Sequence, residues 1–320
     1  MNILITGITG LFGSYLAREF SNIGEIHGLK RTDSSLDLLQ DINFPIIWHD
    51  GDLLSIESLE QAVIGIDLVV HAAGIVSFNR MDSNILHQVN VTGTTNLINV
   101  LLESDTRKLV HISSVAAIGR TSEVKVIDEN FKWVESPMNT DYGKSKYLGE
   151  LEVWRGEQEG LEIIVVNPSI LLGKVSDERS CTDIFQYVLK QNSFYPKGDL
   201  NYIDVRDAAR QTRELVQKNA WGERFILNKE KISYKKFFEL MASVFGKKAP
   251  DKPVTSFMLH LAVFFNSALR KIGLSKSPLN RKTAMISQQK LFFNNQKVNA
   301  LLSSDYYSLE ETFLRSKQTN

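Results

Sequence analysis

The first half of the chain alternates short apolar runs with longer amphipathic segments. The short runs are rich in β-branched residues and predict strands at Asn2–Thr6, Ile26–Lys30, Ile46–Trp48, Leu68–Ala72, Lys108–Ile112 and Glu162–Asn167. Segments with helical periodicity lie between them, at Gly10–Asn22, Ser55–Val63, Ile85–Ser104 and Ser145–Glu159. Strands that alternate with helices predict an α/β fold, in which right-handed crossovers give a doubly wound parallel sheet buried on both faces.

The regular alternation ends after Pro168. A strand-like run at Tyr202–Val205, followed by a helical segment at Arg206–Lys218, indicates a return to the edge of the sheet. The tail from Ser233 contains helices rich in Phe, Leu and Met. We therefore expect a first domain at residues 1–168, to which 201–222 return. A smaller, mostly helical lobe at 169–200 and 223–320 is expected to cover the carboxyl ends of the strands and to bind the substrate.

Composition excludes several classes of protein. Of 320 residues, 43% are hydrophobic and 23% charged, which is typical of a globular protein. Lys plus Arg and Asp plus Glu both number 37, so nothing points to nucleic acid or an anionic membrane as the main partner. Cys181 is the sole cysteine and excludes an intramolecular disulfide; we expect it to be a small, semi-buried residue. The histidines show no metal-type pairing, so no metal is expected.

No targeting or membrane-spanning segment is predicted. The first strand begins at Asn2 and leaves no room for a signal peptide. The most apolar later run, Phe257–Phe265, is shorter than the roughly 20 residues that a membrane span needs, and His260 interrupts it. We expect a cytoplasmic protein.

A glycine-rich turn follows the first strand directly. The strand Asn2–Thr6 leads into Gly7-Ile8-Thr9-Gly10-Leu11-Phe12-Gly13 and then into a helix. Glycine at 7 permits a tight turn, glycine at 10 lets backbone N–H groups approach a pyrophosphate, and glycine at 13 lets the helix pack close to the sheet. The helix N-terminus adds unpaired N–H groups and the positive end of a dipole. A dinucleotide is therefore predicted to bind here, to Gly7, Thr9, Gly10, Leu11, Phe12 and Gly13.

With Thr6 before it, the turn resembles the T-G-x-x-G-x-x-G motif of short-chain dehydrogenases/reductases. Further segments resemble that family's motifs in order: Asp52-Leu53, which would contact adenine; His71-Ala72-Ala73-Gly74; Asn90-Val91-Thr92-Gly93-Thr94; Tyr142-Gly143-Lys144-Ser145-Lys146; and Asn167-Pro168-Ser169, which would lie over the nicotinamide. The resemblance covers residues 1 to 230. The length fits the extended branch, whose members include epimerases, dehydratases and dihydroflavonol-reductase-like carbonyl reductases.

The resemblance implies a Rossmann fold, a nicotinamide cofactor and a homodimer formed through Ile85–Ser104 and Ser145–Glu159. His71 stands where the family usually has Asn, and we expect a structural role for it. Asn90 either supports the active site through its amide or braces its helix.

Tyr142 and Lys146 supply the predicted chemistry. Residues four apart on a helix share a face, so these two side chains point the same way. A tyrosine has a pKa of about 10, and a neighbouring ammonium is expected to lower the pKa of Tyr142. Tyr142 would then be a general acid or base, a role worth about 10²- to 10⁴-fold in rate. In the family the lysine also binds the nicotinamide ribose.

A serine completes the family's catalytic set by orienting the substrate oxygen. Ser114 aligns best with it and Ser113 is the alternative; strand alternation sends their side chains to opposite faces.

The end of the second strand bears on the choice of cofactor. Lys30 and Arg31 are basic and favour the 2′-phosphate of NADP, whereas Asp33 lies within reach of the 2′-hydroxyl of NAD. We predict NADP, with NAD as the alternative.

Three functions compete. The first is an oxidoreductase that transfers hydride between the nicotinamide and a carbonyl or secondary alcohol, a small-molecule substrate. Apolar side chains of the tail would line the substrate pocket of such an enzyme, or would alternatively belong to the core. They are Phe237, Phe238, Phe257, Met258, Phe264 and Phe265. The second is a nucleotide-sugar epimerase or dehydratase with tightly held NAD, which needs cations for a diphosphate; candidates are Arg179, Lys190, Lys197 and Arg281. The third is a non-catalytic dinucleotide-binding protein, which the presence of Tyr142 and Lys146 disfavours.

Overall fold

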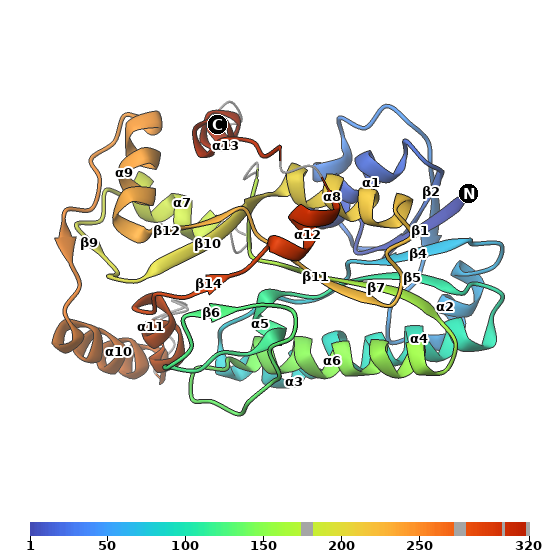
Figure 1. Ribbon diagram of the computed structural model, residues 1–320, viewed down its shortest axis with the longest axis horizontal. Helices are drawn as coiled ribbons and strands as arrows, with labels where there is room; N and C mark the ends of the chain where they lie inside the picture. The colour runs from blue at the N-terminus through green and yellow to red at the C-terminus, as the bar shows by residue number, and fades with distance from the viewer. Residues whose placement is uncertain (174–181, 272–279, 303–304, 318–320) are drawn as a thin grey trace.

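A parallel sheet of seven strands forms the centre of the molecule (Figure 1). The computed structural model describes residues 1–173, 182–271, 280–302 and 305–317. The strand order is β11-β7-β5-β4-β1-β2-β3. These strands are β1 (Asn2–Thr6), β2 (Glu25–Lys30), β3 (Ile46–Asp50), β4 (Leu68–His71), β5 (Lys108–Ile112), β7 (Glu162–Pro168) and β11 (Glu223–Leu227). Every strand predicted before Pro168 is present with its ends within two residues, because continuous β-branched runs are what a sheet buried on both faces requires.

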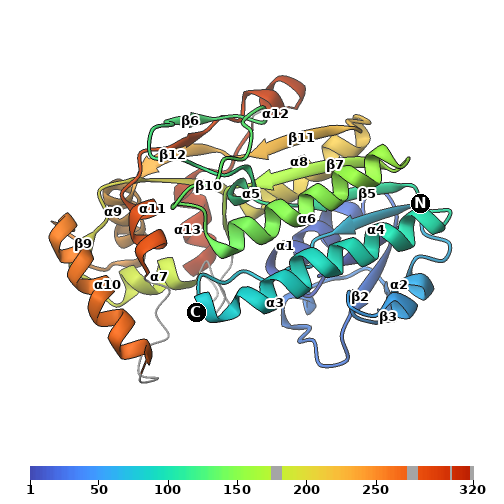
Figure 2. The same ribbon diagram turned by 90° about the horizontal axis from the view of Figure 1, so that it is seen from below.

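Helices cover both faces of the sheet, which confirms the doubly wound architecture. On one face lie α1 (Leu11–Phe20) and α8 (Val205–Gln217); on the other lie α2 (Ile56–Ala62), α4 (Gly93–Glu103) and α6 (Asp141–Gln158). Figure 2 shows α4 and α6 side by side across their face of the sheet. Each layer buries its own apolar cluster against the strands, so two cores sandwich the sheet.

The predicted helix at Ile85–Ser104 is interrupted. It consists of α3 (Ser83–His87), a π-helical stretch at Gln88–Thr92 and α4. A side chain at Gly149 of α6 would bring its Cβ within 2.3 Å of the Asn90 carbonyl oxygen, so the two helices meet closely at this stretch. Helix α6 begins at Asp141, before the predicted Ser145, because the Thr140 side chain accepts a hydrogen bond from Gly143 N at 2.9 Å and caps it.

The remaining elements are small and lie mainly in the C-terminal part. One sheet of three strands contains β8 (Ile170–Leu172), β10 (Asp199–Asp204) and β12 (Glu230–Ser233). Two strand pairs join β9 (Phe194–Tyr195) to β13 (Lys252–Pro253) and β6 (Val126–Ile127) to β14 (Phe292–Phe293). The helices here are α7 (Thr182–Leu189), α9 (Tyr234–Phe245), α10 (Ser256–Lys271), α11 (Arg281–Ser287), α12 (Gln296–Leu301) and α13 (Leu309–Lys317). Short helical turns occur earlier at η1 (Asp37–Leu39), η2 (Arg80–Asp82) and α5 (Val115–Ile118).

One strand was assigned to the wrong sheet. Tyr202–Val205 was predicted to return to the edge of the main sheet, but β10 pairs with β8 and β12 instead. The edge beside β7 is taken by β11, which the sequence assigned to the smaller lobe, while α8 does return and packs against α1. Alternating polarity identifies a strand but not its partner, which explains the error. The division of the chain into two lobes otherwise remains a prediction.

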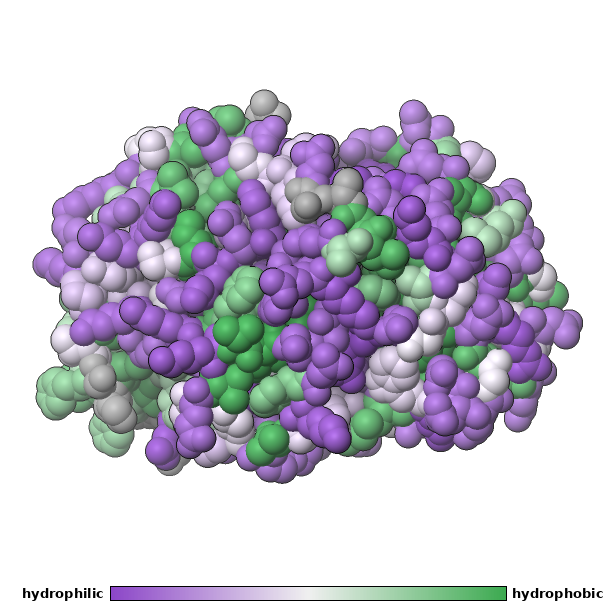
Figure 3. All heavy atoms as spheres, viewed as in Figure 1, coloured by the Kyte–Doolittle hydropathy of each residue, from purple (hydrophilic) through white to green (hydrophobic). Residues whose placement is uncertain are grey.

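The aromatic tail divides between core and surface. Phe237 and Phe238 are buried in a cluster with Phe313, as the core interpretation expects. Phe257 and Phe264 are instead 75% and 69% exposed on α10, where hydrophobic residues gather at one end of a largely hydrophilic face (Figure 3). Met258 is half-buried, and the side chain of Phe265 lies outside the described part. Within the described residues, no helix combines the length and apolar character needed to cross a membrane.

Candidate active site

The glycine turn joins β1 to α1 and can be built only from glycine at two positions. Gly7 has a φ of +69°, and a Cβ there would lie 2.6 Å from Ala73 Cα. A Cβ at Gly13 would lie 2.1 Å from the Gly7 carbonyl oxygen. Because β1 pairs with β4, the turn lies against the segment Ala72–Ala73, whose amides bond to Thr6. The turn and the end of β4 therefore form one backbone surface.

This surface fits the phosphates of a dinucleotide. Gly10 is the N-cap of α1 and makes no side-chain capping bond, so the amides of the first turn are left for an anion. Leu11 and Thr9 are half-buried in the same turn, and Phe12 anchors it in the core. No acidic residue occupies the first turn of α1, where a carboxylate would compete with the ligand.

The ends of β2 and β3 carry the residues expected to face the adenosine. Lys30 Nζ lies 2.6 Å from Asp50 Oδ1, so its charge is already paired. Arg31 is 61% exposed and only loosely paired with Asp33, at 3.5 Å. Asp52 accepts a hydrogen bond from Leu54 N, and Leu53 is buried against Gly93. Arg31 is therefore the side chain in this group that is most available to a ribose phosphate.

Ser114 and Tyr142 meet at the carboxyl end of β5. Ser114 is the N-cap of α5, and its side chain hydrogen-bonds Tyr142, in the first turn of α6. The Phe78 ring packs edge-on against the Tyr142 ring, with centroids 5.9 Å apart. Burial raises the pKa of Tyr142 above its ordinary value, and the Ser114 hydrogen bond offsets this only in part. The expectation that a neighbouring ammonium lowers the pKa of Tyr142 was therefore wrong for this state of the protein.

Lys146 lies one helical turn further along, and its contacts explain that outcome. It is buried, and its ammonium donates a hydrogen bond to the Ile112 carbonyl oxygen at 2.7 Å. Burial lowers the pKa of Lys146 to about 8, although Glu150 raises it in part. A Cβ at Gly74 would lie 3.9 Å from Nζ, so the ammonium sits beside the end of β4. Lys146 thus faces the surface predicted to hold the nicotinamide half of the cofactor.

The two candidate serines have different partners. Ser113 Oγ is buried and donates to Glu150 Oε2 at 2.6 Å. Asn167, at the end of β7, donates to the same oxygen and to the Ser114 carbonyl, both at 2.9 Å. Pro168 and Ser169 follow it, both buried. Ser113 is engaged by Glu150, so the contacts favour Ser114 as the serine that accompanies Tyr142.

Glu150 is a residue that the sequence did not single out. It is 3% exposed and lies one turn beyond Lys146 on the same face of α6. Its second oxygen, Oε1, accepts from Trp154 Nε1 at 3.2 Å and from Arg224 at 2.8 Å. This one carboxylate therefore links α6 to the ends of β5 and β7 and to β11. The spacing Tyr142, Lys146, Glu150 is the sequence signal that could have revealed it.

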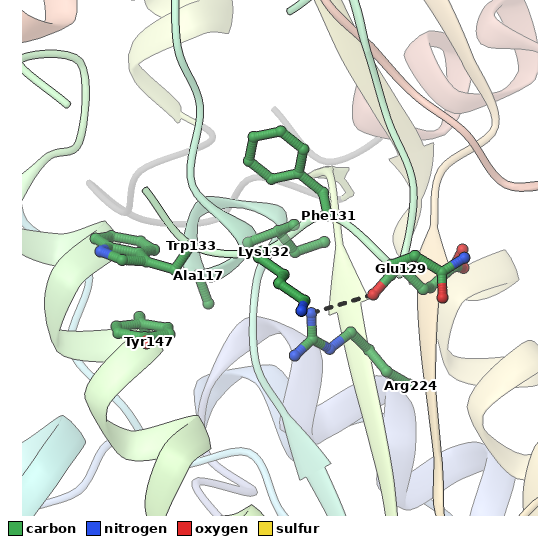
Figure 4. A pocket seen from close by; sticks show the side chains of 9 residues that line it. Ala117, Glu129, Phe131, Lys132, Trp133, Tyr147 and Arg224 are labelled. Carbon is green, nitrogen blue, oxygen red and sulfur yellow. Dashed lines mark hydrogen bonds between the residues drawn. The ribbon is translucent and has the colours of Figure 1, made fainter. Parts of the chain in front are cut away.

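Arg224 also lines a pocket of about 370 Å³ on the flank of α6 (Figure 4). Trp133 and Tyr147 stack at its side with ring centroids 4.3 Å apart. The lining residues are Ala117, Ile118, Glu129, Asn130, Phe131, Lys132, Trp133, Tyr147 and Arg224. None of the three predicted catalytic residues is among them, so this pocket is not where Tyr142 acts.

His71 and Asn90 both brace the site. His71 Nδ1 lies 2.7 Å from Thr6 Oγ1 and its Nε2 3.1 Å from Thr94 Oγ1. Burial lowers the pKa of His71 to about 3, so it is neutral at physiological pH, in line with the structural role expected for it. The Asn90 amide bonds to both backbone groups of Ile75 and to Ser145 Oγ. These contacts hold the segment after β4 against α6 and favour the bracing role for Asn90.

Of the cations predicted for a diphosphate, Arg281 lies near this site, between Asn280, which donates to the Phe78 carbonyl, and Lys282, which pairs with Asp141 at the start of α6. Lys190, Lys197 and Arg281 are all exposed, and Arg179 and Cys181 lie outside the described residues. Among the residues that the structure describes, no three His, Cys, Asp or Glu side chains gather as metal ligands would.

Comparison with known proteins establishes the family. Residues 3–226 match the model of the NAD dependent epimerase/dehydratase family, to which the chain therefore belongs. It is 30% identical to a Synechocystis sp. protein provisionally named dihydroflavonol 4-reductase, over 92% of this chain and 87% of that protein. Cinnamoyl-CoA reductase 1 of Petunia hybrida is 25% identical over 87% and 89% of the two chains. The predicted extended short-chain dehydrogenase/reductase family is thereby confirmed.

A solved structure supports the fold. UDP-glucuronic acid 4-epimerase from Bacillus cereus, in complex with NAD, superposes with a TM-score of 0.77 at 18% identity, over 100% of this chain and 98% of the epimerase. The shared architecture extends through the C-terminal region. The chain is thus an enzyme of a family that contains both reductases and epimerases.

Proposed function

We propose that this enzyme is an NADP-dependent carbonyl reductase, able to oxidise the corresponding secondary alcohol in reverse. The observation that carries the proposal is the hydrogen-bonded pair of Ser114 and Tyr142, with Lys146 one turn away beside Gly74. The two reductases similar to this chain support a reductase.

The residues around the glycine turn would hold the cofactor. The turn from Gly7 to Gly13 would bind the pyrophosphate, Arg31 the 2′-phosphate and Ala72–Gly74 the nicotinamide half. When bound, the nicotinamide supplies or accepts the hydride. Lys146, whose ammonium donates to the Ile112 carbonyl at 2.7 Å, would also bind the ribose hydroxyls.

Proton transfer falls to Tyr142. Its raised pKa keeps the phenol protonated at neutral pH, which suits a group that donates a proton to a carbonyl oxygen during reduction. Ser114 would orient the same oxygen by hydrogen bonding. We also propose, as the family resemblance implies, that α4 and α6 form a homodimer interface.

Replacing Tyr142 by Phe tests the proposal. We expect kcat/KM for carbonyl reduction to fall by about 10²-fold or more, because the proton donor is lost. NADPH affinity, measured by fluorescence titration, should stay within about two-fold, and NADPH should bind more tightly than NADH. Tyr147→Phe is the matched control, since Tyr147 stacks on Trp133 at the other pocket and should keep full activity.

Normal turnover by the Tyr142→Phe protein would reject the mechanism. Epimerisation of a nucleotide sugar by protein purified with bound NAD would instead establish the epimerase alternative.

A further inference from the structure

Arg120 is fixed to both catalytic segments. It follows Ser114 by one short helix, α5, and the turn at Gly119. Its backbone N–H donates to Asn139 Oδ1 at 3.2 Å, and Asn139 immediately precedes Thr140, the cap of α6. Arg120 therefore keeps a set position relative to the start of α5 and the start of α6, where Ser114 and Tyr142 meet.

Arg120 is half-buried, and its guanidinium has no acidic partner among the described residues. Its Cζ lies 5.6 Å from the centroid of the Phe293 ring, and Tyr234, the first residue of α9, interacts with it electrostatically. Within the described residues, no carboxylate lies within 4.0 Å of it. Burial lowers the pKa of Arg120 to about 10, which shows how far the charge has left water. The side chain is nonetheless only half-buried, so it remains accessible.

Unsatisfied polar atoms gather around the same place. Gln289 Nε2 donates to the carbonyl of Thr121, next to Arg120, but its buried Oε1 has no partner in the described part. Gln288 accepts from Lys197 N, while its buried Nε2 is likewise without a partner there. Gly198, the next residue, accepts from Tyr234 N at 3.3 Å. Buried polar atoms normally have partners, so this group is suited to a polar ligand.

We propose that Arg120 binds a carboxylate of the substrate, with the Gln288 amide and the Tyr234 hydroxyl beside it. This inference rests on the proposed function, because Ser114 and Tyr142 define where the reacting carbonyl lies. A planar guanidinium matches a carboxylate in shape, and its single charge balances that of a monoanion. A diphosphate would call for further cations; Lys197, whose backbone N–H donates to Gln288, lies close but has an exposed side chain. With Phe293 and Phe78 as walls, the favoured substrate is an apolar or aromatic keto acid.

Calorimetry with paired probes tests the inference on the full-length chain loaded with NADP⁺. The probes are 4-acetylbenzoate and 4′-methylacetophenone, which are similar in size and differ in charge. We expect the carboxylate to bind about 10- to 100-fold more tightly, the range for hydrogen bonds to a charged group. Arg120→Gln should remove this difference without changing the affinity for the neutral ketone, and Arg120→Lys should restore part of it.

Arg155→Gln is the control, because Arg155 lies on the surface of α6 and pairs with Glu152 and Glu159. Equal affinities for the two probes, no binding of either, or discrimination that persists in Arg120→Gln would overturn the inference. Tighter binding of 4-acetylphenyl phosphate than of the benzoate would also overturn it in favour of a phosphate ester.

The same probes separate this inference from the proposed function. Reduction of the neutral ketone by a protein that ignores the carboxylate would reject the anion site and retain the reductase. Binding of the carboxylate that depends on Arg120, with no reduction of any carbonyl probe, would retain the anion site and reject the reductase.

Discussion

Two charged side chains flank the Ser114–Tyr142 pair, and their surroundings differ sharply. Glu150 is buried and has four partners: Ser113, Asn167, Trp154 and Arg224. Arg120 lies over the Phe293 ring and interacts electrostatically with Tyr234, and no carboxylate of the described residues lies within 4.0 Å of it. Glu150 is buried and Arg120 is half-buried, and of the two charges only that of Glu150 has a counter-charge among the described residues.

The difference separates scaffold from binding site. A buried charge whose hydrogen bonds are satisfied holds its neighbours in place, and removing it leaves those neighbours unpaired. A charge without a counterion contributes little to folding, because nothing offsets its desolvation. Such a group is better suited to a ligand that brings the missing charge. Variants at Glu150 and Arg120 test this difference through their free energies of unfolding, and variants at Glu150 also through the pH dependence of activity.

The largest effect is expected from Glu150→Ala. Arg224 would lose its buried partner, and Ser113 and Asn167 would lose an acceptor, so the free energy of unfolding should fall by about 3 kcal/mol. Urea denaturation followed by circular dichroism measures this. Glu152→Ala on the same helix is the control and should cost at most about 1 kcal/mol, because its ion pair with Arg155 is partly exposed. An equal decrease in the free energy of unfolding for Glu150→Ala and Glu152→Ala would mean that the hydrogen bonds of Glu150 do not stabilise the fold.

A smaller effect is expected in the pH dependence of reduction. Lys146 has a pKa of about 8, so its ammonium form is lost as pH rises through that value, while Tyr142, with its raised pKa, stays protonated. We expect kcat/KM to be constant below pH 8 and to decline above it. Glu150→Gln removes the carboxylate that raises the pKa of Lys146, so the decline should begin at lower pH.

Full pH–rate profiles of the wild type, Glu150→Gln and Glu152→Gln check this. A decline at the same pH in all three would show that Glu150 does not act on Lys146.

The smallest effect is expected from Arg120→Met. Losing the contact with Phe293 costs about 1 kcal/mol or less, and relief from burying an uncompensated charge opposes that loss. The free energy of unfolding should therefore change by no more than about 1 kcal/mol in urea denaturation. A loss as large as that of Glu150→Ala would assign Arg120 to the scaffold and contradict the carboxylate site.

The sequence predicts best what the backbone decides locally. The strand at Asn2–Thr6, the glycines at 7 and 13 and the pair Tyr142–Lys146 lie where expected, because turn geometry and helical spacing act over a few residues. The roles proposed for these residues remain predictions, since position alone does not test chemistry.

Features set by distant residues were missed. The contacts of Glu150 are made with Asn167 and Arg224, and those of Arg120 with Tyr234 and Phe293. None of these partners is a neighbour in the local sequence pattern. The partner of β10 and the π-helical stretch at Gln88–Thr92 likewise depend on tertiary contacts rather than on local pattern. The pKa of Tyr142 was misjudged because its burial is invisible in the spacing Y-x-x-x-K.

The pairing of β11 with β7 has an evolutionary consequence. The chain leaves the main sheet after β7 and rejoins it only at β11, while β8 and β10 form part of another sheet in between. Insertions or deletions in that excursion, outside α8, can therefore be accommodated without shifting the strand ends that carry Ser114 and the glycine turn. The length of this segment and the geometry of the catalytic strand ends are thus free to change separately.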